Sequence, residues 1–167
     1  MSRLQTNAIR HLGSAVDNLT LDNAGRVLMP NKPAFIATAG SATITTGVVV
    51  VLTTAELNIG GCYNTSNGRF TAPVTGTYRF SITGLYTWGA GAATFKGIWR
   101  RNGSGVGVAY EYQTASLNNS YNTIGSSSVL VYCTAGDYVD LVNGDIAGHG
   151  AVHISGTQTK LCGELVG

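Results

Sequence analysis

The sequence predicts an all-β protein, built as an antiparallel sandwich or barrel. Helical periodicity is nearly absent, whereas short segments rich in Val, Ile, Thr, Tyr and Phe recur between Gly, Asn and Pro residues. Only 11% of the 167 residues are charged and 44% are hydrophobic. A typical globular protein has about 25% charged residues. A chain of this length has room for one domain with a substantial core, with or without a short extension.

The expected strands are apolar or β-branched segments bounded by turn residues. They are Ala34–Thr38, Val48–Leu52, Arg69–Thr71, Gly76–Trp88, Thr94–Arg101, Val106–Tyr112, Ser127–Cys133, Tyr138–Val142 and Thr157–Val166. Residues that tolerate positive φ predict tight turns at Asn67-Gly68, Arg101-Asn102-Gly103, Ala135-Gly136-Asp137 and Asn143-Gly144-Asp145. Pro73 cannot donate to a ladder and should mark a strand end or corner.

Residues 1–32, called the leader below, differ from the rest of the chain. The leader is polar, with one weak alternating stretch, Leu19–Leu28, that is broken at Asp22–Gly25. Because so short a segment cannot form its own core, we expect it to be disordered alone or ordered against a partner, as an attachment segment. Its apolar candidates for that contact are Ile9, Leu12, Leu19, Leu21 and Val27. A frayed terminus with one small hairpin is the alternative.

Four consecutive valines predict an unusual strand; they are Val48, Val49, Val50 and Val51. A strand with one face on the core and one in water alternates in hydrophobicity, and this segment does not. Both of its faces should therefore be buried. Since few charged residues are available to cover a surface, we expect a second subunit, rather than another part of the chain, to cover the second face.

Charge and hydropathy exclude several classes of protein. The formal net charge is +2, from 10 Lys and Arg against 8 Asp and Glu, without a basic block, so we expect no nucleic acid or anionic membrane as a partner. The longest apolar run, Gly47–Leu52, is far below the roughly 18 residues of a membrane helix, so no membrane insertion is expected. The first residues lack the apolar stretch of a secretory signal, which predicts synthesis in the cytoplasm.

The sequence carries no pattern for catalysis, a metal or a cofactor. The cysteines Cys62, Cys133 and Cys162 are odd in number and widely spaced, which favours buried thiols over a disulfide framework or a zinc site. His149 and His153 would lie about 13 Å apart on one strand face, too far for one metal ion. A glycoside hydrolase would need paired acidic residues, and the 8 Asp and Glu are scattered. We expect no enzyme, no metal site and no cofactor.

Aromatic and amide side chains are the candidates for ligand recognition. Tyr86 and Trp88 share one face of a predicted strand and could stack on sugar rings, although packing in a core or interface is the alternative. Asn118, Asn119 and Tyr121 lie in a polar loop between two predicted strands, and loops of this kind carry recognition.

Three stretches resemble the C1q-like family, which is also called the C1q/tumour necrosis factor family. The region from Gly61 to Tyr86 matches its central signature at Gly68, Phe70, Thr71, Pro73, Gly76, Tyr78 and Phe80. A second stretch matches at Ser126, Leu130, Gly136, Asp137, Val139 and Leu141. The closing Thr159–Val166 resembles the terminal strand of the family, with Leu161 in place of Phe and Cys162 in place of Ser.

The resemblance implies a two-sheet jelly-roll head over residues 33–167 that assembles as a tight homotrimer and binds ligands without an active site. It adds Tyr78 and Phe80 to Val48, Val49, Val50 and Val51 as candidates for the core or trimer interface. The calcium sites of some members are not carried over, because Asp137 matches a turn position of the family but the neighbouring ligands cannot be aligned.

The leader resembles the corresponding segment of bacteriophage tail- and head-fibre proteins. The matching residues are Asn18, Thr20, Leu21, Gly25, Val27, Pro33 and Phe35. This resemblance implies a virion protein, made in the host cytoplasm and released by lysis, whose leader binds other virion proteins. The head would be a tail-fibre or fibre-tip knob that recognises a host surface glycan or envelope protein. A capsid decoration protein that stabilises the head of the particle is the alternative.

Overall fold

The computed structural model of the chain describes residues 6–15, 17–87, 91–117, 122–124, 127–144, 151–154 and 156–167. These residues form four antiparallel sheets and one short 3-10 turn, Gly156–Gln158. The predicted all-β sandwich is confirmed. Within the part of the chain that is described, no helix is long and apolar enough to cross a membrane.

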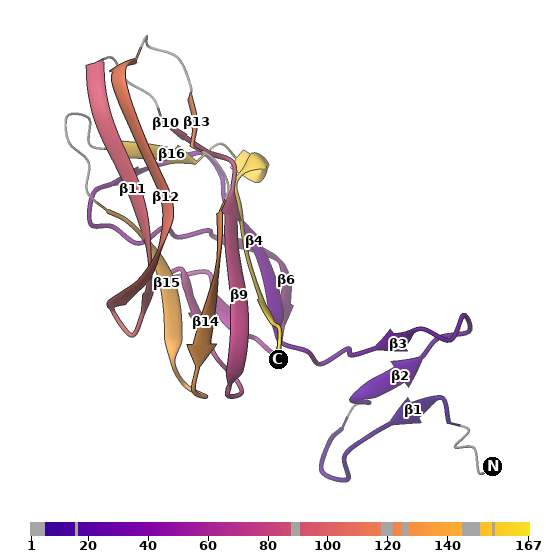
Figure 1. The fold of residues 1–167 in the computed structure, drawn as a ribbon. Coiled ribbons are helices and arrows are strands. Elements are labelled where there is room, and N and C mark those ends of the chain that lie inside the picture. The colour runs from indigo at the N-terminus through magenta and orange to yellow at the C-terminus, as the bar shows by residue number, and fades with distance from the viewer. Residues whose placement is uncertain are drawn as a thin grey trace.

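Two five-stranded sheets pack face to face and form the head (Figure 1). The first, called the β9 sheet, has the order β14-β9-β17-β4-β6, from Ser127–Cys133, Gly76–Thr83, Lys160–Leu165, Ala34–Thr38 and Thr54–Ile59. The second, called the β11 sheet, has the order β12-β11-β15-β8-β7, from Ser104–Leu117, Gly91–Arg101, Tyr138–Asn143, Arg69–Thr71 and Tyr63–Asn64. A smaller sheet has the order β13-β10-β16-β5, from Asn122–Ile124, Leu85–Thr87, Ala151–Ile154 and Ala42–Thr45.

The core between the two large sheets is rich in aromatic rings. Phe35 stacks on Tyr63 at a centroid distance of 4.5 Å, and Phe70 meets the ring of Phe80 edge-on at 5.0 Å. Trp99 closes the cluster against Phe80 at 5.8 Å. Offset and edge-on pairs of this kind stabilise a core beyond the area that they bury.

Gly163 makes room for this aromatic cluster. It lies on β17 between β9 and β4, opposite both Phe80 and Phe35. A Cβ atom added to Gly163 would lie 2.3 Å from a ring carbon of Phe35 and 2.8 Å from one of Phe80. Because a carbon atom cannot approach another so closely, only glycine lets both rings fill the space above β17.

Most of the predicted strands are present. Ala34–Thr38, Arg69–Thr71 and Ser127–Cys133 are confirmed to the residue. The predicted strand Gly76–Trp88 is divided at Gly84, which has a φ of +71° and lies against the backbone of Gln158. Strands β5 and β6 were not expected, because β5 is only four residues long and β6 has no run of β-branched or aromatic residues.

The predicted turns are largely confirmed. Gly68, Asn102 and Gly136 have φ values of 70°, 51° and 93°, and Pro73 lies between β8 and β9. Asn143 instead ends β15, and Asp145 lies outside the described residues.

The prediction of a regular strand over Val48–Leu52 is wrong. The segment lies beside β15, where Val50 N–H donates to Leu141 O at 2.8 Å and Asn143 N–H donates to Val48 O at 3.0 Å. Its ladder amounts to a single bridge between Val49 and Val142. The inward Val50 and Leu52 are fully buried, but Val49 and Val51 are half-buried and Val48 is 47% exposed. One chain therefore closes only one face of this segment, and cover by a second subunit stays a prediction.

The leader has structure of its own. Strands Ala8–Ile9, Leu19–Leu21 and Val27–Leu28 form the three-stranded sheet β1-β2-β3, which stands beside the head and joins it through residues 29–33 (Figure 1). The three strands replace the single hairpin of the alternative expectation, and order against a partner stays a prediction. The difference arises at the second turn, where Asp22 Oδ1 accepts hydrogen bonds from the N–H groups of Ala24 and Arg26, both at 2.9 Å, and returns the chain into β3.

Candidate functional site

The outward side of the β9 sheet is the most distinctive surface among the described residues. Along β9, Tyr78, Phe80 and Ile82 point into the core, so the alternate residues Arg79 and Ser81 point outward. We call the outward side chains of the five strands of this sheet the open face.

Strand register arranges the open face in rows that run across all five strands. One row contains Ser128, Ser81, Cys162, Ile36 and Leu57, each paired with the next. The neighbouring row contains Leu130, Arg79, Glu164, Ala34 and Ile59. The rows bring together small, apolar and hydroxyl side chains, with one pair of opposite charges near the middle.

The charges on the open face are paired within the chain. Arg79 donates from Nε to Glu164 Oε1 at 3.1 Å and also donates from Nη2 to the same oxygen. At the margin, Lys160 Nζ lies 2.7 Å from Glu56 Oε2. Two positive and two negative side chains therefore cancel, and the face offers little net charge to a partner.

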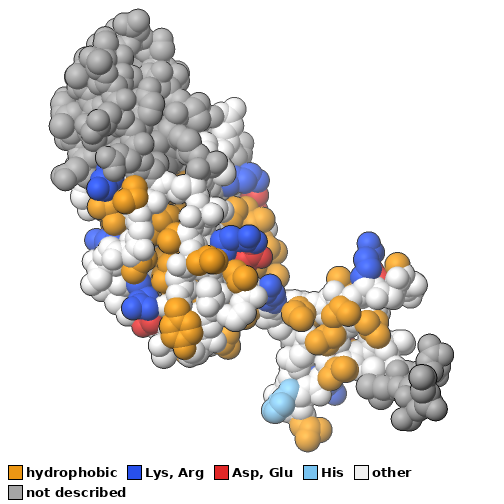
Figure 2. All heavy atoms as spheres, in the orientation of Figure 1, with side chains coloured by type: hydrophobic (Ala, Val, Ile, Leu, Met, Phe, Trp, Pro, Cys, Tyr) orange, Lys and Arg blue, Asp and Glu red, His pale blue; other side chains and the backbone are white. Residues whose placement is uncertain are grey.

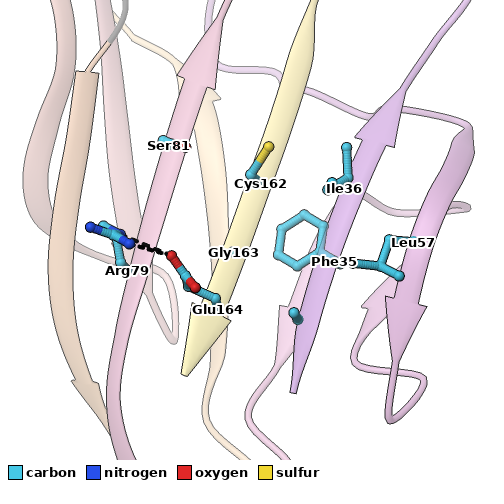
Figure 3. A pocket seen from close by; sticks show the side chains of 9 residues that line it. Phe35, Ile36, Leu57, Arg79, Ser81, Cys162, Gly163 and Glu164 are labelled. Atoms are coloured by element: carbon cyan, nitrogen blue, oxygen red, sulfur yellow. Dashed lines mark hydrogen bonds and ion pairs between the residues drawn. The ribbon is translucent and has the colours of Figure 1, made fainter. Parts of the chain in front are cut away.

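Large apolar side chains remain uncovered on this face. The exposed fractions are 38% for Leu57, 63% for Leu130 and 59% for Tyr132. A hollow of about 240 Å³ lies over β17, β4 and β6, where Ile36, Leu57 and Cys162 point into it beside the Arg79–Glu164 pair (Figure 3). An apolar surface with a polar rim is typical of a protein–protein contact.

The cysteine thiols are not suited to chemistry. Burial raises the pKa of Cys62 and of Cys133 to about 11, and it also raises the pKa of Cys162 on the open face. All three are free and carry a protonated thiol at neutral pH. The described residues contain no group of three His, Cys, Asp or Glu side chains that could hold a metal ion.

The outward side of the β11 sheet carries a buried carboxylate. Asp140 is 1% exposed and accepts hydrogen bonds from Arg100 Nε at 2.8 Å, Arg100 Nη2 at 3.0 Å and Arg69 Nε at 3.4 Å. The guanidinium of Arg69 also lies 4.1 Å from the ring centroid of Tyr138. The hydrogen bond with Asp140 raises the pKa of Arg100. This network links β8, β11 and β15. Both oxygens of the Asp140 carboxylate are engaged by the two arginine side chains.

The predicted site residues lie in four separate places of the described structure. Tyr78 and Phe80 are fully buried in the core, and Val48, Val49, Val50 and Val51 lie beside β15, away from the open face. Tyr86 lies on β10, where its backbone pairs with those of Thr123 and His153. Trp88, Asn118, Asn119 and Tyr121 lie outside the described residues. Of the leader candidates, Ile9, Leu19, Leu21 and Val27 lie in the leader sheet, and Leu12 is fully exposed between β1 and β2.

Sequence reasoning missed the open face. Its signal was present in Ser127–Cys133, where Leu130 and Tyr132 alternate with Val129, Val131 and Cys133. This strand is apolar on both faces, which is the same criterion that was applied to the four valines.

Two facing β-sheets with this strand order define a jelly-roll head of the C1q/tumour necrosis factor class. The chain belongs to the C1q domain family, whose sequence pattern matches residues 34–162. Among curated proteins, no sequence matches the chain.

Three solved structures share the fold. The globular domain of zebrafish complement 1qA protein is 16% identical, with a TM-score of 0.59, over 81% of this chain and 98% of that one. Eiger TNF from S. frugiperda is 12% identical, with a TM-score of 0.59, over 82% and 94%. Murine APRIL is 14% identical, with a TM-score of 0.56, over 81% and 99%.

Proposed function

We propose that the protein is a non-enzymatic binding head that forms a homotrimer through the open face. Domains of the C1q/tumour necrosis factor class commonly form homotrimers. The observation that carries the proposal is the open face itself, which exposes Leu57, Leu130 and Tyr132 while its charges are paired within the chain. Uncovered apolar side chains on a neutral surface favour a partner with the same character, such as a second copy.

The layout of the open face supports a closed ring. The most exposed apolar side chains, Leu130 and Tyr132, lie on the edge strand β14, whereas the hollow lies over β17, β4 and β6. When an exposed edge of one molecule binds a hollow at a different place on the next, the contact is heterologous. Such contacts form a closed ring if the rotation between neighbouring copies closes. Three copies form that ring, each with its β14 edge against the hollow of the next.

The proposed place of action is a bacteriophage virion, where the trimer is a tail-fibre or fibre-tip protein that recognises the host surface. The support is the leader pattern, with Asn18, Thr20, Leu21, Gly25 and Val27, ahead of a C1q-like head. The leader joins the head to the particle. Three weak sites per trimer, and several trimers per particle, would bind a surface glycan or envelope protein through avidity.

Capsid decoration is the second candidate, favoured by one observation. Strand β3 of the leader sheet ends at Leu28 and β4 of the head begins at Ala34, so only residues 29–33 separate them. A trimer held this close to its attachment segment is suited to lying on a capsid and reinforcing it.

Binding of the labelled protein to intact bacterial cells, beside a mass determination in solution, tests both candidates. A protein mass of three times 17.3 kDa, together with saturable binding to the cells, supports the receptor-binding head. The same trimer without binding to any host on which the phage grows supports the decoration protein. A stable monomer overturns both.

A further inference from the structure

The leader sheet has one apolar face. Directly paired residues of antiparallel strands point to the same side, and so do residues two apart on one strand. Ile9 pairs with Leu19, and Leu21 pairs with Val27. Ile9, Leu19, Leu21 and Val27 therefore share one side, called the leader face below, while Ala8, Thr20 and Leu28 share the other.

The leader face is uncovered in the single chain. The exposed fractions are 52% for Ile9, 42% for Leu21 and 56% for Val27, and hydrophobic side chains gather on this part of the molecule (Figure 2). A hollow of about 160 Å³ is lined by Ile9, Leu19 and Leu21 of the leader face together with Thr6 and Ala8. Strands of two or three residues cannot enclose a core, so a sheet of this size needs cover from another surface to be stable.

The path of the chain ties the leader to the β9 sheet. Leu165 N–H donates to Pro33 O at 3.0 Å, and Ala34 then begins β4 opposite Glu164. Ala34 and Glu164 belong to the open face. Residues 29–33 span at most about 17 Å when fully extended. If three heads meet through their open faces, each leader sheet therefore begins within this reach of the shared contact.

The chemistry of the leader face suits a copy of itself. Its four residues are aliphatic. The charged residues of the nearest turn form an ion pair with each other, since Arg26 Nε lies 2.5 Å from Asp22 Oδ2. Short tethers hold the three copies at an effective concentration in the millimolar range, which an independent partner in solution does not reach. From the aliphatic face and the short tether, we infer that the leader faces of three protomers pack against one another and form the apolar core of a stem. This inference rests on the proposed homotrimer.

Two adjacent residues of β3 provide matched variants. Val27 lies on the leader face and Leu28 on the opposite side, with exposed fractions of 56% and 48%. Val27→Asp and Leu28→Asp in the full chain introduce the same charge into the same strand. Three measurements are made on each: mass in solution, amide hydrogen exchange at Leu21, and isotope-filtered NOEs in trimers mixed from labelled and unlabelled chains. Leu21 N–H is informative because it donates to Asn7 O at 2.9 Å between β1 and β2.

The unaltered chain should give a trimer with NOEs between the methyl groups of Ile9, Leu21 and Val27 of different copies. Val27→Asp should abolish them and speed exchange at Leu21 by about tenfold or more, while Leu28→Asp should retain them. Both variants should remain trimeric through the head. A trimer without NOEs between copies, or with equal exchange in both variants, overturns the inference and leaves the homotrimer standing. A monomeric unaltered chain overturns both, and the mass alone shows it.

Discussion

Arg100 on β11 donates two hydrogen bonds, of 2.8 and 3.0 Å, to the carboxylate of Asp140 on the paired strand β15. The Asp140 side chain is inaccessible to solvent, whereas that of Arg100 is 27% exposed. The acid is therefore the partner that depends on the pair, because Arg100 and Arg69 are the residues that compensate its charge in the described part of the chain.

Asp140→Ala should destabilise the head by about 2 kcal/mol, the scale of a lost hydrogen bond to a charged group. Urea unfolding should show a lower midpoint with an unchanged slope. The control is Arg26→Gln, which removes the exposed ion pair with Asp22 in the leader and should change the stability of the head by less than about 0.5 kcal/mol. Equal midpoints for the two variants would contradict the structural role of Asp140.

Gly163→Ala should also destabilise the head, because the new methyl group would overlap the rings of Phe35 and Phe80. Overpacking of this kind costs about 1–3 kcal/mol, and each kcal/mol lowers the Tm of a domain of this size by about 2–4 °C. Thermal unfolding measures the shift. Gly40→Ala, where an added Cβ has nothing within 4 Å, should leave the Tm in place.

Leu130→Asp should dissociate the proposed trimer without unfolding the protomer. The side chain is 63% exposed in one chain, so a carboxylate there is tolerated in the monomer but would be buried without a partner in the ring. Val108→Asp on the β11 sheet, at 50% exposure, is the control and should remain trimeric. Sedimentation measures both. A trimeric Leu130→Asp variant would exclude this edge from the interface.

Alkaline pH should progressively lower the stability of the protein. Burial raises the pKa of Cys62 and Cys133 from 9.0 to about 11, so the folded state holds protons that the unfolded state releases. Stability is therefore complete below pH 9 and falls between pH 9 and about 11. Burial also raises the pKa of Tyr63 and of Tyr78, which acts in the same direction. Urea midpoints at pH 8 and pH 10 measure the loss, and Cys133→Ala should make it smaller; an equal loss in that variant would contradict the assignment.

Removal of residues 1–32 should leave a soluble head that still forms the proposed trimer but is not incorporated into phage particles. The head keeps the open face intact, because all five strands of the β9 sheet lie beyond residue 33. Particle assembly with tagged chains measures incorporation. If the truncated protein joins the particle as efficiently as the full chain, attachment through the leader is excluded.

Many strands of the head could be predicted because the pattern of hydrophobic residues within each strand indicates which of its faces is buried. In Gly76–Thr83, alternation of Tyr78, Phe80 and Ile82 with polar residues marks a strand with one face on the core. The strand β6, Thr54–Ile59, carries no such pattern, since its place at the sheet edge depends on pairing with β4. Pairing between distant segments is not encoded in either segment alone.

Most of the site could not be predicted for the same reason, although the alternation in Ser127–Cys133 was a local signal for one of its strands. Cys162, Ile36 and Leu57 come from three separate parts of the sequence, and only the register of β17, β4 and β6 places them in one row. The four valines predicted an interface because they are contiguous. In the structure, Val50 N–H donates to Leu141 O, so the segment lies beside β15 and not on the open face. In the leader, Leu19, Leu21 and Val27 were recognised as apolar, but the turn at Asp22 decides that they face the same way.

The pairing of Arg79 with Glu164 inside one chain has a kinetic consequence for assembly. Because the charged side chains of the open face are paired within the chain, attraction between opposite charges does not guide two protomers toward each other. Their encounter should proceed at about 10⁵–10⁶ M⁻¹s⁻¹, the rate of unsteered association. Ionic strength should then leave the rate of trimer formation nearly unchanged.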